Sequence, residues 1–521
     1  MMVESEVTGV IAIDNQLKQF LLVLCVSLSV AAISQMFGWF RKIPYTLLLV
    51  IVGACLAFLD VRLVSLSPGL ILSIFLPPLL FEAAWNSNWA HLKEQLTPVS
   101  LYAVFGVAAS VAGIAYGLTQ FAGLSAATAL LIGACLSATD PVSVMSLFKA
   151  LGVGKTLATV MEGESLFNDG TAIVAFSFLL AFSLGQSDLA PQLILRDLLA
   201  VVGIGLGLGL LVGVTISYLT QRFDLPLVEQ SLTLVAAYGA YLLAEEFGGS
   251  GVIATVAMAL VLGNYGSRVG MNPRTRAIVT EFWDFIAFFV NSIVFLLIGN
   301  QIRFETLMAN GWVITVTVLA MTLSRLVFVF ILSWFSNQIS TSNLSLSEQV
   351  VLWWSGLRGA ISMALALSIP VFFPGRAEII ATVFGAVFFS LLVQGLTIQP
   401  LLSRLNLLGD SPVQKTYRET IARQAALNRA LDYLQQAEDR PGLDTSFYTT
   451  QTQLIKEELT SIEQRIEQLK VDHPDFKELA AQQLISELQA LEAETYAELM
   501  KAGQLNEILA PLLGDLNQAK A

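Results

Sequence analysis

Long apolar runs separated by short polar loops make up most of the chain before Gly409. A helix needs about 20 apolar residues to cross a bilayer, and by that measure we count about thirteen candidate spans. They begin near Leu17, Pro44, Pro68, Thr97, Leu124, Leu157, Gln192, Pro226, Ser250, Ile278, Gly311, Glu348 and Ala377. The pattern predicts an all-α polytopic membrane protein.

Two of these apolar runs are interrupted by polar residues. The breaks lie at residues 137–141 in the fifth predicted span and at residues 355–359 in the twelfth. An odd offset between the two spans means that they enter the membrane from opposite sides, as expected for inverted repeats whose broken helices cross near the midplane. Taken singly, each break is equally compatible with an ordinary kinked helix.

Basic residues in the loops indicate how the chain is oriented. Arg41 and Lys42 form the first basic pair after a span, so the positive-inside rule places them in the cytoplasm. Alternation from there puts Met1 outside and the C-terminal tail inside. The first apolar run, residues 17–40, is too long for the core of a signal peptide, so we expect it to be a retained span.

Composition supports a membrane protein and excludes other classes. Hydrophobic residues make up 55% of the chain and charged residues only 13%. The net charge of −12 comes largely from the region after Gly409 and argues against nucleic-acid binding. Cys25, Cys55 and Cys135 lack the spacing of a disulfide framework or a zinc site.

Carboxylates inside the apolar runs are candidate functional residues, because charge is costly in a membrane. They are Glu82, Asp140, Glu164 and Asp169. Asp169 is the candidate exchanging group, since burial favours the protonated form of a carboxylate and lets protons compete with sodium. Asp140 lies at a helix break, where unwound carbonyls and Thr139 can add oxygen ligands. The alternatives are a helix N-cap for Asp140 and an interfacial acid for Glu82.

The helical period separates two stripes around Asp169. Ser165 lies four positions before Asp169 and shares its stripe, whereas Glu164 and Asn168 form the neighbouring stripe. We therefore expect one stripe to line a cavity and the other to be braced by neighbouring helices.

Two arginines also lie in apolar surroundings. Arg325 is too deep within residues 313–335 to reach water, so it needs a buried acidic partner, and Glu164 is the best candidate for a structural ion pair. Arg358, in the second break, can act as a fixed positive charge against the carbonyl ends of the broken helices.

With these residues in view, the chain resembles the sodium/proton antiporters of the cation:proton antiporter-1 family, the NhaP-type proteins, over residues 17 to about 409. The resemblance rests on five ordered motifs: FLPPLLFEAA (75–84), ATDPVSV (138–144), EGESLFNDG (162–170), Ser324 with Arg325, and GLRGAIS (356–362). Residues 221–241 and 263–268 are similar to cyanobacterial members. The resemblance implies a homodimer with thirteen spans, dimerisation and core subdomains within residues 1–409, and elevator-type alternating access.

The resemblance also implies roles for individual residues. A sodium site would be formed by Asp169, Asp140, Ser165, Glu82 and the backbone of Thr139, with Asn168 as support and Glu164 paired with Arg325. The neighbouring Asn168 and Asp169 are similar to the electroneutral branch, which exchanges one sodium for one proton. No cofactor is implied beyond the transported sodium or lithium and protons.

The region 410–521 differs in composition and predicts amphipathic helices in the cytoplasm, interrupted near Pro441 and Pro474. It could form a regulatory or dimer-stabilising domain, or an appendage without control over transport. The two histidines, His91 and His473, both lie outside the apolar runs. Carboxylates must therefore supply any pH response within the membrane.

Together these features predict an electroneutral Na⁺(Li⁺)/H⁺ antiporter in the plasma membrane that serves pH and sodium homeostasis, and not an enzyme. Three alternatives remain from the sequence. A K⁺/H⁺ antiporter would differ only in the size of its cavity. A passive cation channel also needs polar groups at depth. An intramembrane aspartic hydrolase could use Asp140 and Asp169 as a dyad that shares a proton.

Overall fold

A computed structural model of the chain describes residues 2–36, 44–61, 63, 67–185, 191–222, 225–267, 271–339, 343–408, 412–436 and 445–472. Every regular element within these ranges is a helix, which confirms the predicted all-α class. The chain divides into two compact units, Met1–Leu408 and Gly409–Ala521.

Helices in the first half of the larger unit include three π-helical turns, labelled η. In chain order they are α1 (Met2–Met36), α2 (Tyr45–Phe58), η2 (Leu70–Phe75), α3 (Leu76–Asn86), α4 (Trp89–Glu94), α5 (Leu96–Leu101), η3 (Tyr102–Gly106), α6 (Val107–Gly117), η4 (Leu118–Ala122), α7 (Ala126–Cys135), α8 (Val142–Leu151), α9 (Lys155–Ser183) and α10 (Pro191–Thr220).

The second half continues this pattern of helices joined by short loops. Its elements are α11 (Pro226–Glu246), α12 (Gly251–Val261), η5 (Leu262–Gly266), α14 (Pro273–Asn300), α15 (Phe304–Ala309), α16 (Gly311–Ile339), α17 (Leu346–Trp354), α18 (Ala360–Ser368), α19 (Arg376–Phe389), η6 (Ser390–Gln394) and α20 (Gly395–Arg404). Proline marks several helix starts, because its fixed φ suits the first turn and its missing N–H is not needed there.

Each of the predicted spans coincides with a helix or with a run of two to four consecutive helical elements. Among the described residues, seven helical stretches are long and apolar enough to cross a membrane: 96–122, 155–183, 196–220, 226–246, 274–300, 311–339 and 376–404. The other predicted spans fall on shorter helices, so the count of thirteen remains a prediction. Arg41 and Lys42, on which the predicted orientation rests, lie outside the described residues.

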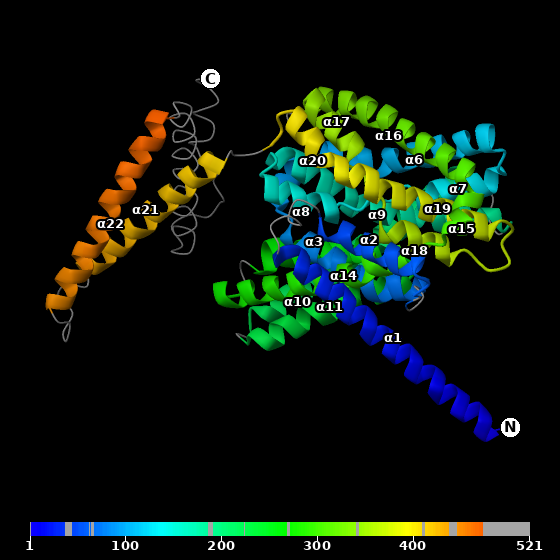
Figure 1. Cartoon of the computed structure of the whole chain (residues 1–521), viewed down its shortest axis with the longest axis horizontal. Helices are drawn as coiled ribbons and strands as arrows, with labels where there is room; N and C mark the ends of the chain where they lie inside the picture. The colour runs from blue at the N-terminus through cyan, green and yellow to red at the C-terminus, as the bar shows by residue number, and fades with distance from the viewer. Residues whose placement is uncertain are drawn as a thin grey trace. The chain divides into compact units, whose positions relative to one another are not determined.

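Two apolar cores organise the larger unit. One is built mainly from α2, the helices of 96–151, the second half of α14, α16 and α17–α20, and the other mainly from α3, α11, α12 and the first half of α14. Helix α9 contributes to both, with Met161 in the first core and Leu166 in the second. Helix α14 runs along α2 and also packs on α3 (Figure 1). The central position of α9 brings its polar residues between the two groups of helices.

The smaller unit contains two packed helices, α21 (Pro412–Gln436) and α22 (Thr445–Asp472). Tyr417 of α21 packs with Ile462 and Ile466 of α22 in a small apolar cluster. Ile421, Leu427 and Leu469 pack against this cluster, so each helix has an apolar stripe, as the amphipathic pattern predicts. Residues 473–521 of the predicted tail domain lie outside the described residues.

Candidate ion-binding site

Both predicted breaks are unwound segments, and they meet. The first lies between the end of α7 and the start of α8, and the second between α17 and α18. Where they cross, the backbone N–H of Asp140 donates a hydrogen bond of 2.8 Å to the carbonyl oxygen of Leu357. Unwinding frees backbone groups that membrane lipid cannot satisfy, so each broken helix supplies partners for the other.

Arg358 lies fully buried at this crossing. Its Nη1 donates to the carbonyl oxygens of Ser137 and Ala138, at 2.8 and 2.9 Å, just beyond the end of α7. A positive charge at the C-terminal end of a helix offsets the partial negative charge of its free carbonyls. Arg358 therefore lies against the carbonyl end of a broken helix.

Two glycines of the second break make room for charged side chains. A Cβ on Gly359 would collide with the carboxylate of Asp140, and a Cβ on Gly356 would collide with the guanidinium of Arg325. The GLRG string thus allows the broken helix to approach an acid and a base closely. The sequence showed the string without showing which side chains required the glycines.

Thr139 joins the first break to α9. Its hydroxyl shares a hydrogen bond of 3.0 Å with the hydroxyl of Ser165 and accepts one of 2.6 Å from Nδ2 of Asn168. The backbone N–H of Thr139 also donates to Oδ1 of Asn168 at 3.4 Å. Asn168 is therefore bonded to the unwound segment and is not among the described residues that line the cavity; its supporting role remains a prediction from the family resemblance.

Glu164 and Arg325 form a buried ion pair. Nη1 of Arg325 donates to Oε1 of Glu164 at 2.7 Å, and Nη2 donates to Oε2 at 3.0 Å. Nε and Nη2 also donate to the carbonyl of Leu352, in the last turn of α17. Since both charges are matched and hydrogen-bonded, this pair can join α9, α16 and α17 without a free charge in the membrane.

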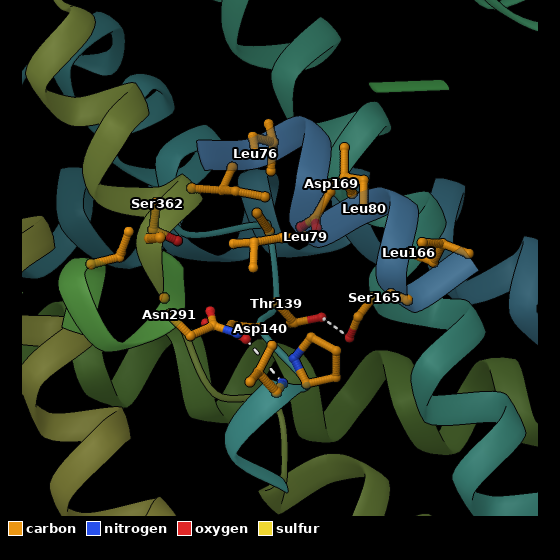
Figure 2. Close-up of a pocket in the computed structure, with 18 of the residues that line it drawn as sticks. Leu76, Leu79, Leu80, Thr139, Asp140, Ser165, Leu166, Asp169, Asn291 and Ser362 are labelled. Carbon is orange, nitrogen blue, oxygen red and sulfur yellow. Dashed lines mark hydrogen bonds between the residues drawn. The ribbon is translucent and has the colours of Figure 1, made fainter. Parts of the chain in front are cut away.

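A cavity of about 70 Å³ lies beside the crossing. Four predicted site residues line it, as Figure 2 shows: Thr139, Asp140, Ser165 and Asp169. Oδ1 of Asp169 is buried and has no hydrogen-bond partner among the described residues. Two carboxylates and two hydroxyls form an all-oxygen donor set, which suits a hard cation.

Glu82 occupies a different position from the other predicted ligands. It is not among the described residues that line the cavity, although its neighbours Leu80 and Ala83 are. Its carboxylate accepts a hydrogen bond of 2.8 Å from Nδ2 of Asn86, which also donates to Oδ1 of Asp284 at 3.0 Å. A role for Glu82 as a direct cation ligand remains a prediction from the family resemblance.

Three polar residues that line the cavity were not predicted as site residues: Glu162, Asn291 and Ser362, whose buried hydroxyl has no hydrogen-bond partner among the described residues. Glu162 lies on the same stripe of α9 as Ser165 and Asp169, at i, i+3 and i+7, so its helical period could have identified it. Asn291 lines the cavity from α14. Its only sequence signal is an amide in the middle of a long apolar run.

The fold and the site together indicate the class of protein to which the chain belongs. An all-helical membrane chain whose two broken helices cross beside buried carboxylates has the architecture of a secondary ion transporter. Residues 18–404 match the family model described as "Sodium/hydrogen exchanger, transmembrane". The chain belongs to this family and is a secondary transporter, not an enzyme.

Relatives and solved structures agree with this assignment. The chain is 54% identical to the Na⁺/H⁺ antiporter ApNhaP of Aphanothece halophytica, over 97% of each chain. It is 51% identical to the low-affinity Na⁺/H⁺ antiporter NhaS1 of Synechocystis sp., over 98% of each. Its fold is similar to that of the sodium proton antiporter MjNhaP1 of Methanocaldococcus jannaschii, with a TM-score of 0.60 and 22% identity over 74% of this chain and 99% of that one. The family resemblance seen in the motifs is thereby confirmed.

Proposed function

We propose that this protein exchanges sodium or lithium for protons across the plasma membrane, and so serves pH and sodium homeostasis. The observation that carries the proposal is the orphaned Oδ1 of Asp169, buried in a cavity that Asp140 also lines. A carboxylate oxygen with no protein donor is available to a proton or to a cation. Binding of one would displace the other, and this competition is the basis of antiport. The names of the two cyanobacterial relatives support the choice of sodium.

The proposed cation site consists of Asp169, Asp140, Ser165 and the backbone oxygen of Thr139, with Glu82 as a further ligand. Asn168 would hold the Thr139 segment in place. The Glu164–Arg325 pair keeps the neighbouring charge on α9 neutralised, so Asp169 is left to exchange. With one exchanging carboxylate, one sodium would move for one proton, and transport would be electroneutral.

Alternating access would arise from movement of one group of helices against the other. The presence of two apolar cores supports this proposal, and the cavity has residues of both in its lining. We propose that the body carrying the crossing moves in an elevator-like manner while the other body forms the homodimer. The N-terminus would lie outside and the tail inside, with α21 and α22 in a regulatory domain.

Proton movement in everted membrane vesicles tests this function. The parent protein and Asp169→Asn are compared by a pH-sensitive dye after addition of sodium, lithium or potassium. Sodium-driven proton release by the parent that is lost in Asp169→Asn is the expected result. Asp197→Asn is the matched control for loss of one carboxylate and should exchange as the parent does, because Asp197 is exposed on α10 and does not line the cavity.

Other outcomes distinguish the competing functions. A larger response to potassium than to sodium would identify a K⁺/H⁺ antiporter. Cation flux without proton movement would identify a channel. If neither cation moved but the protein cleaved membrane peptides, the aspartic hydrolase would replace the transporter. Exchange in reconstituted liposomes that responds to an imposed membrane potential would overturn electroneutrality.

A further inference from the structure

The cavity has two chemically different walls. The polar wall comes from the first break, α9 and α18, and carries both aspartates. The apolar wall comes from η2, α3 and α14, and consists of Ile71, Phe75, Leu76, Leu79, Leu80, Ala83, Asn291 and Val294. Among these described lining residues, Asn291 is the only one with a polar side chain. Its amide is therefore the one polar group on an apolar wall of a cavity that three carboxylates also line, those of Asp140, Glu162 and Asp169.

The position of this amide is set by a second helix. The hydroxyl of Tyr45, the first residue of α2, lies close to the side chain of Asn291, and the ring of Tyr45 packs on that of Phe288, one turn earlier on α14, with 5.3 Å between the ring centroids. Asn291 is only 5% exposed, and in Figure 2 its amide is directed toward the Asp140 side of the cavity. Tyr45 also lies within electrostatic range of Asp140 and Glu82. The Tyr45–Asn291 pair thus connects the apolar wall to the acids around the pathway.

A buried amide in an apolar helix is costly wherever its donors and acceptors lack partners, so the presence of Asn291 calls for an explanation. An asparagine side chain offers two acceptor positions and two donors, so Tyr45 engages only part of its hydrogen-bonding capacity. The remaining donor and acceptor positions of the Asn291 amide face the cavity. A neutral oxygen there can coordinate a hard cation without adding a titrating group. Such a ligand would change cation binding and leave the number of exchanged protons unaltered.

We propose that Asn291 is a further ligand for the transported cation, contributed by the apolar wall, and that Tyr45 orients its amide. This inference rests on the proposed exchange function. It makes Asn291 a determinant of selectivity, since the amide is held across the cavity from the carboxylates and the spacing between them favours cations of one size. Tyr45 is a positioning residue that acts only through Asn291.

A purely structural role makes a different prediction. If the amide served only to join α14 to α2, its loss would reduce the amount of folded protein without changing which cation is preferred. The ratio of the apparent KM values for lithium and sodium separates these roles, because it is independent of the amount of protein. Asn300, also on α14, provides a matched control: its side chain bonds the backbone of Val61 and Leu63 and does not line the cavity.

The experiment measures proton release in everted vesicles over a concentration series of sodium and of lithium, for the parent, Asn291→Leu, Asn291→Gln, Tyr45→Phe and Asn300→Leu. For Asn291→Leu we expect the apparent KM for sodium to rise about tenfold, the range seen when a metal site loses one supporting group, with a changed lithium-to-sodium ratio. Tyr45→Phe should change the apparent KM for sodium and the lithium-to-sodium ratio in the same direction as Asn291→Leu does, but by a smaller factor. Asn300→Leu should change only the maximal rate, through the amount of protein in the membrane.

The outcomes distinguish this inference from the function on which it rests. If the parent releases no protons with sodium, the exchange function itself is wrong. If the parent exchanges and Asn291→Leu keeps the parental KM and ratio, the exchange function stands and the ligand role of Asn291 is overturned. Should Asn291→Leu not reach the membrane, Asn291→Gln decides: the longer amide should change the ratio, and parental values would reject the proposal.

Discussion

Asp140 and Leu357 are joined by a backbone hydrogen bond of 2.8 Å, although they lie in opposite halves of the chain. Each residue lies in the unwound part of a broken helix, so the bond ties one break directly to the other. The backbone of Asp140 is consequently held by an unwound segment from the other half of the sequence, while Oδ1 of its carboxylate accepts a hydrogen bond of 3.0 Å from the backbone N–H of Val142. The following predictions test how this crossing depends on its neighbours.

Replacing Gly359 by alanine should abolish exchange. The added Cβ would collide with the carboxylate of Asp140. Asp140 cannot move away, because its backbone N–H is hydrogen-bonded to the carbonyl of Leu357 in the same segment as Gly359. Gly239→Ala is the control, since a Cβ there meets nothing within 4 Å and alanine favours the helix. Sodium-driven proton release in vesicles, normalised to the amount of protein, is the measurement. Parental activity in Gly359→Ala would show that the side chain of Asp140 does not lie in contact with Gly359.

Replacing Arg325 by leucine should destabilise the protein strongly. Glu164 would be left as a buried charge without its partner, at a cost of about 3 to 5 kcal/mol. Adding Glu164→Gln to this variant should restore part of the stability, because the uncompensated charge is then removed. Thermal unfolding in detergent, monitored by size-exclusion chromatography, measures the loss of stability in Arg325→Leu and its recovery in the double variant. No recovery in the double variant would mean that the arginine stabilises the fold by its packing and its bonds to Leu352.

Replacing Thr139 by valine should weaken the support of the first break. Valine keeps the shape and the backbone oxygen but removes the hydroxyl shared with Ser165 and Asn168. Leaving a buried amide without its acceptor costs about 1 to 3 kcal/mol. We expect a lower unfolding temperature and a higher apparent KM for sodium.

Thr317→Val is the control for this change. Thr317 is also fully buried, but its hydroxyl donates only to the carbonyl of Val313 within the same helix, at 2.7 Å. That carbonyl is already a partner in the helix backbone, so the KM for sodium should not change. Equal effects of the two substitutions would contradict a specific role for Thr139.

Replacing Arg358 by glutamine should reduce both stability and exchange. The carbonyls of Ser137 and Ala138 would lose their charged donor, and hydrogen bonds to charged groups contribute about 1.5 to 3 kcal/mol each. Arg358→Lys should be intermediate, because it keeps the charge but lacks the planar donor group. Arg404→Gln, at an exposed position on α20, tests the loss of an arginine by itself. Thermal unfolding and proton release are measured together, and an Arg358→Gln variant as stable as Arg404→Gln would reject the capping role.

The order of apolar and polar residues along the chain is enough to predict the class of fold and many of the candidate site residues. Apolar runs long enough to cross a bilayer leave helices as the available structure, because a single chain segment must satisfy its own backbone hydrogen bonds there. Polar interruptions mark the breaks for the same reason. Even the pairing of Glu164 with Arg325 could be anticipated, since a charge deep in an apolar run requires an opposite charge and few acids were available.

Which residues surround the cavity depends on how the helices pack against one another, and this is seen only in the tertiary structure. Asn291 and Tyr45 belong to separate helices, and nothing local to either indicates that they meet opposite Asp140. Likewise, Gly359 is required because of a carboxylate from a distant segment, and Glu82 lies beside the cavity lining although its motif resembles that of a ligand. Hydrophobic pattern specifies that a helix is buried, whereas contacts between helices depend on packing among segments far apart in the chain, and that information is not carried by any one of them.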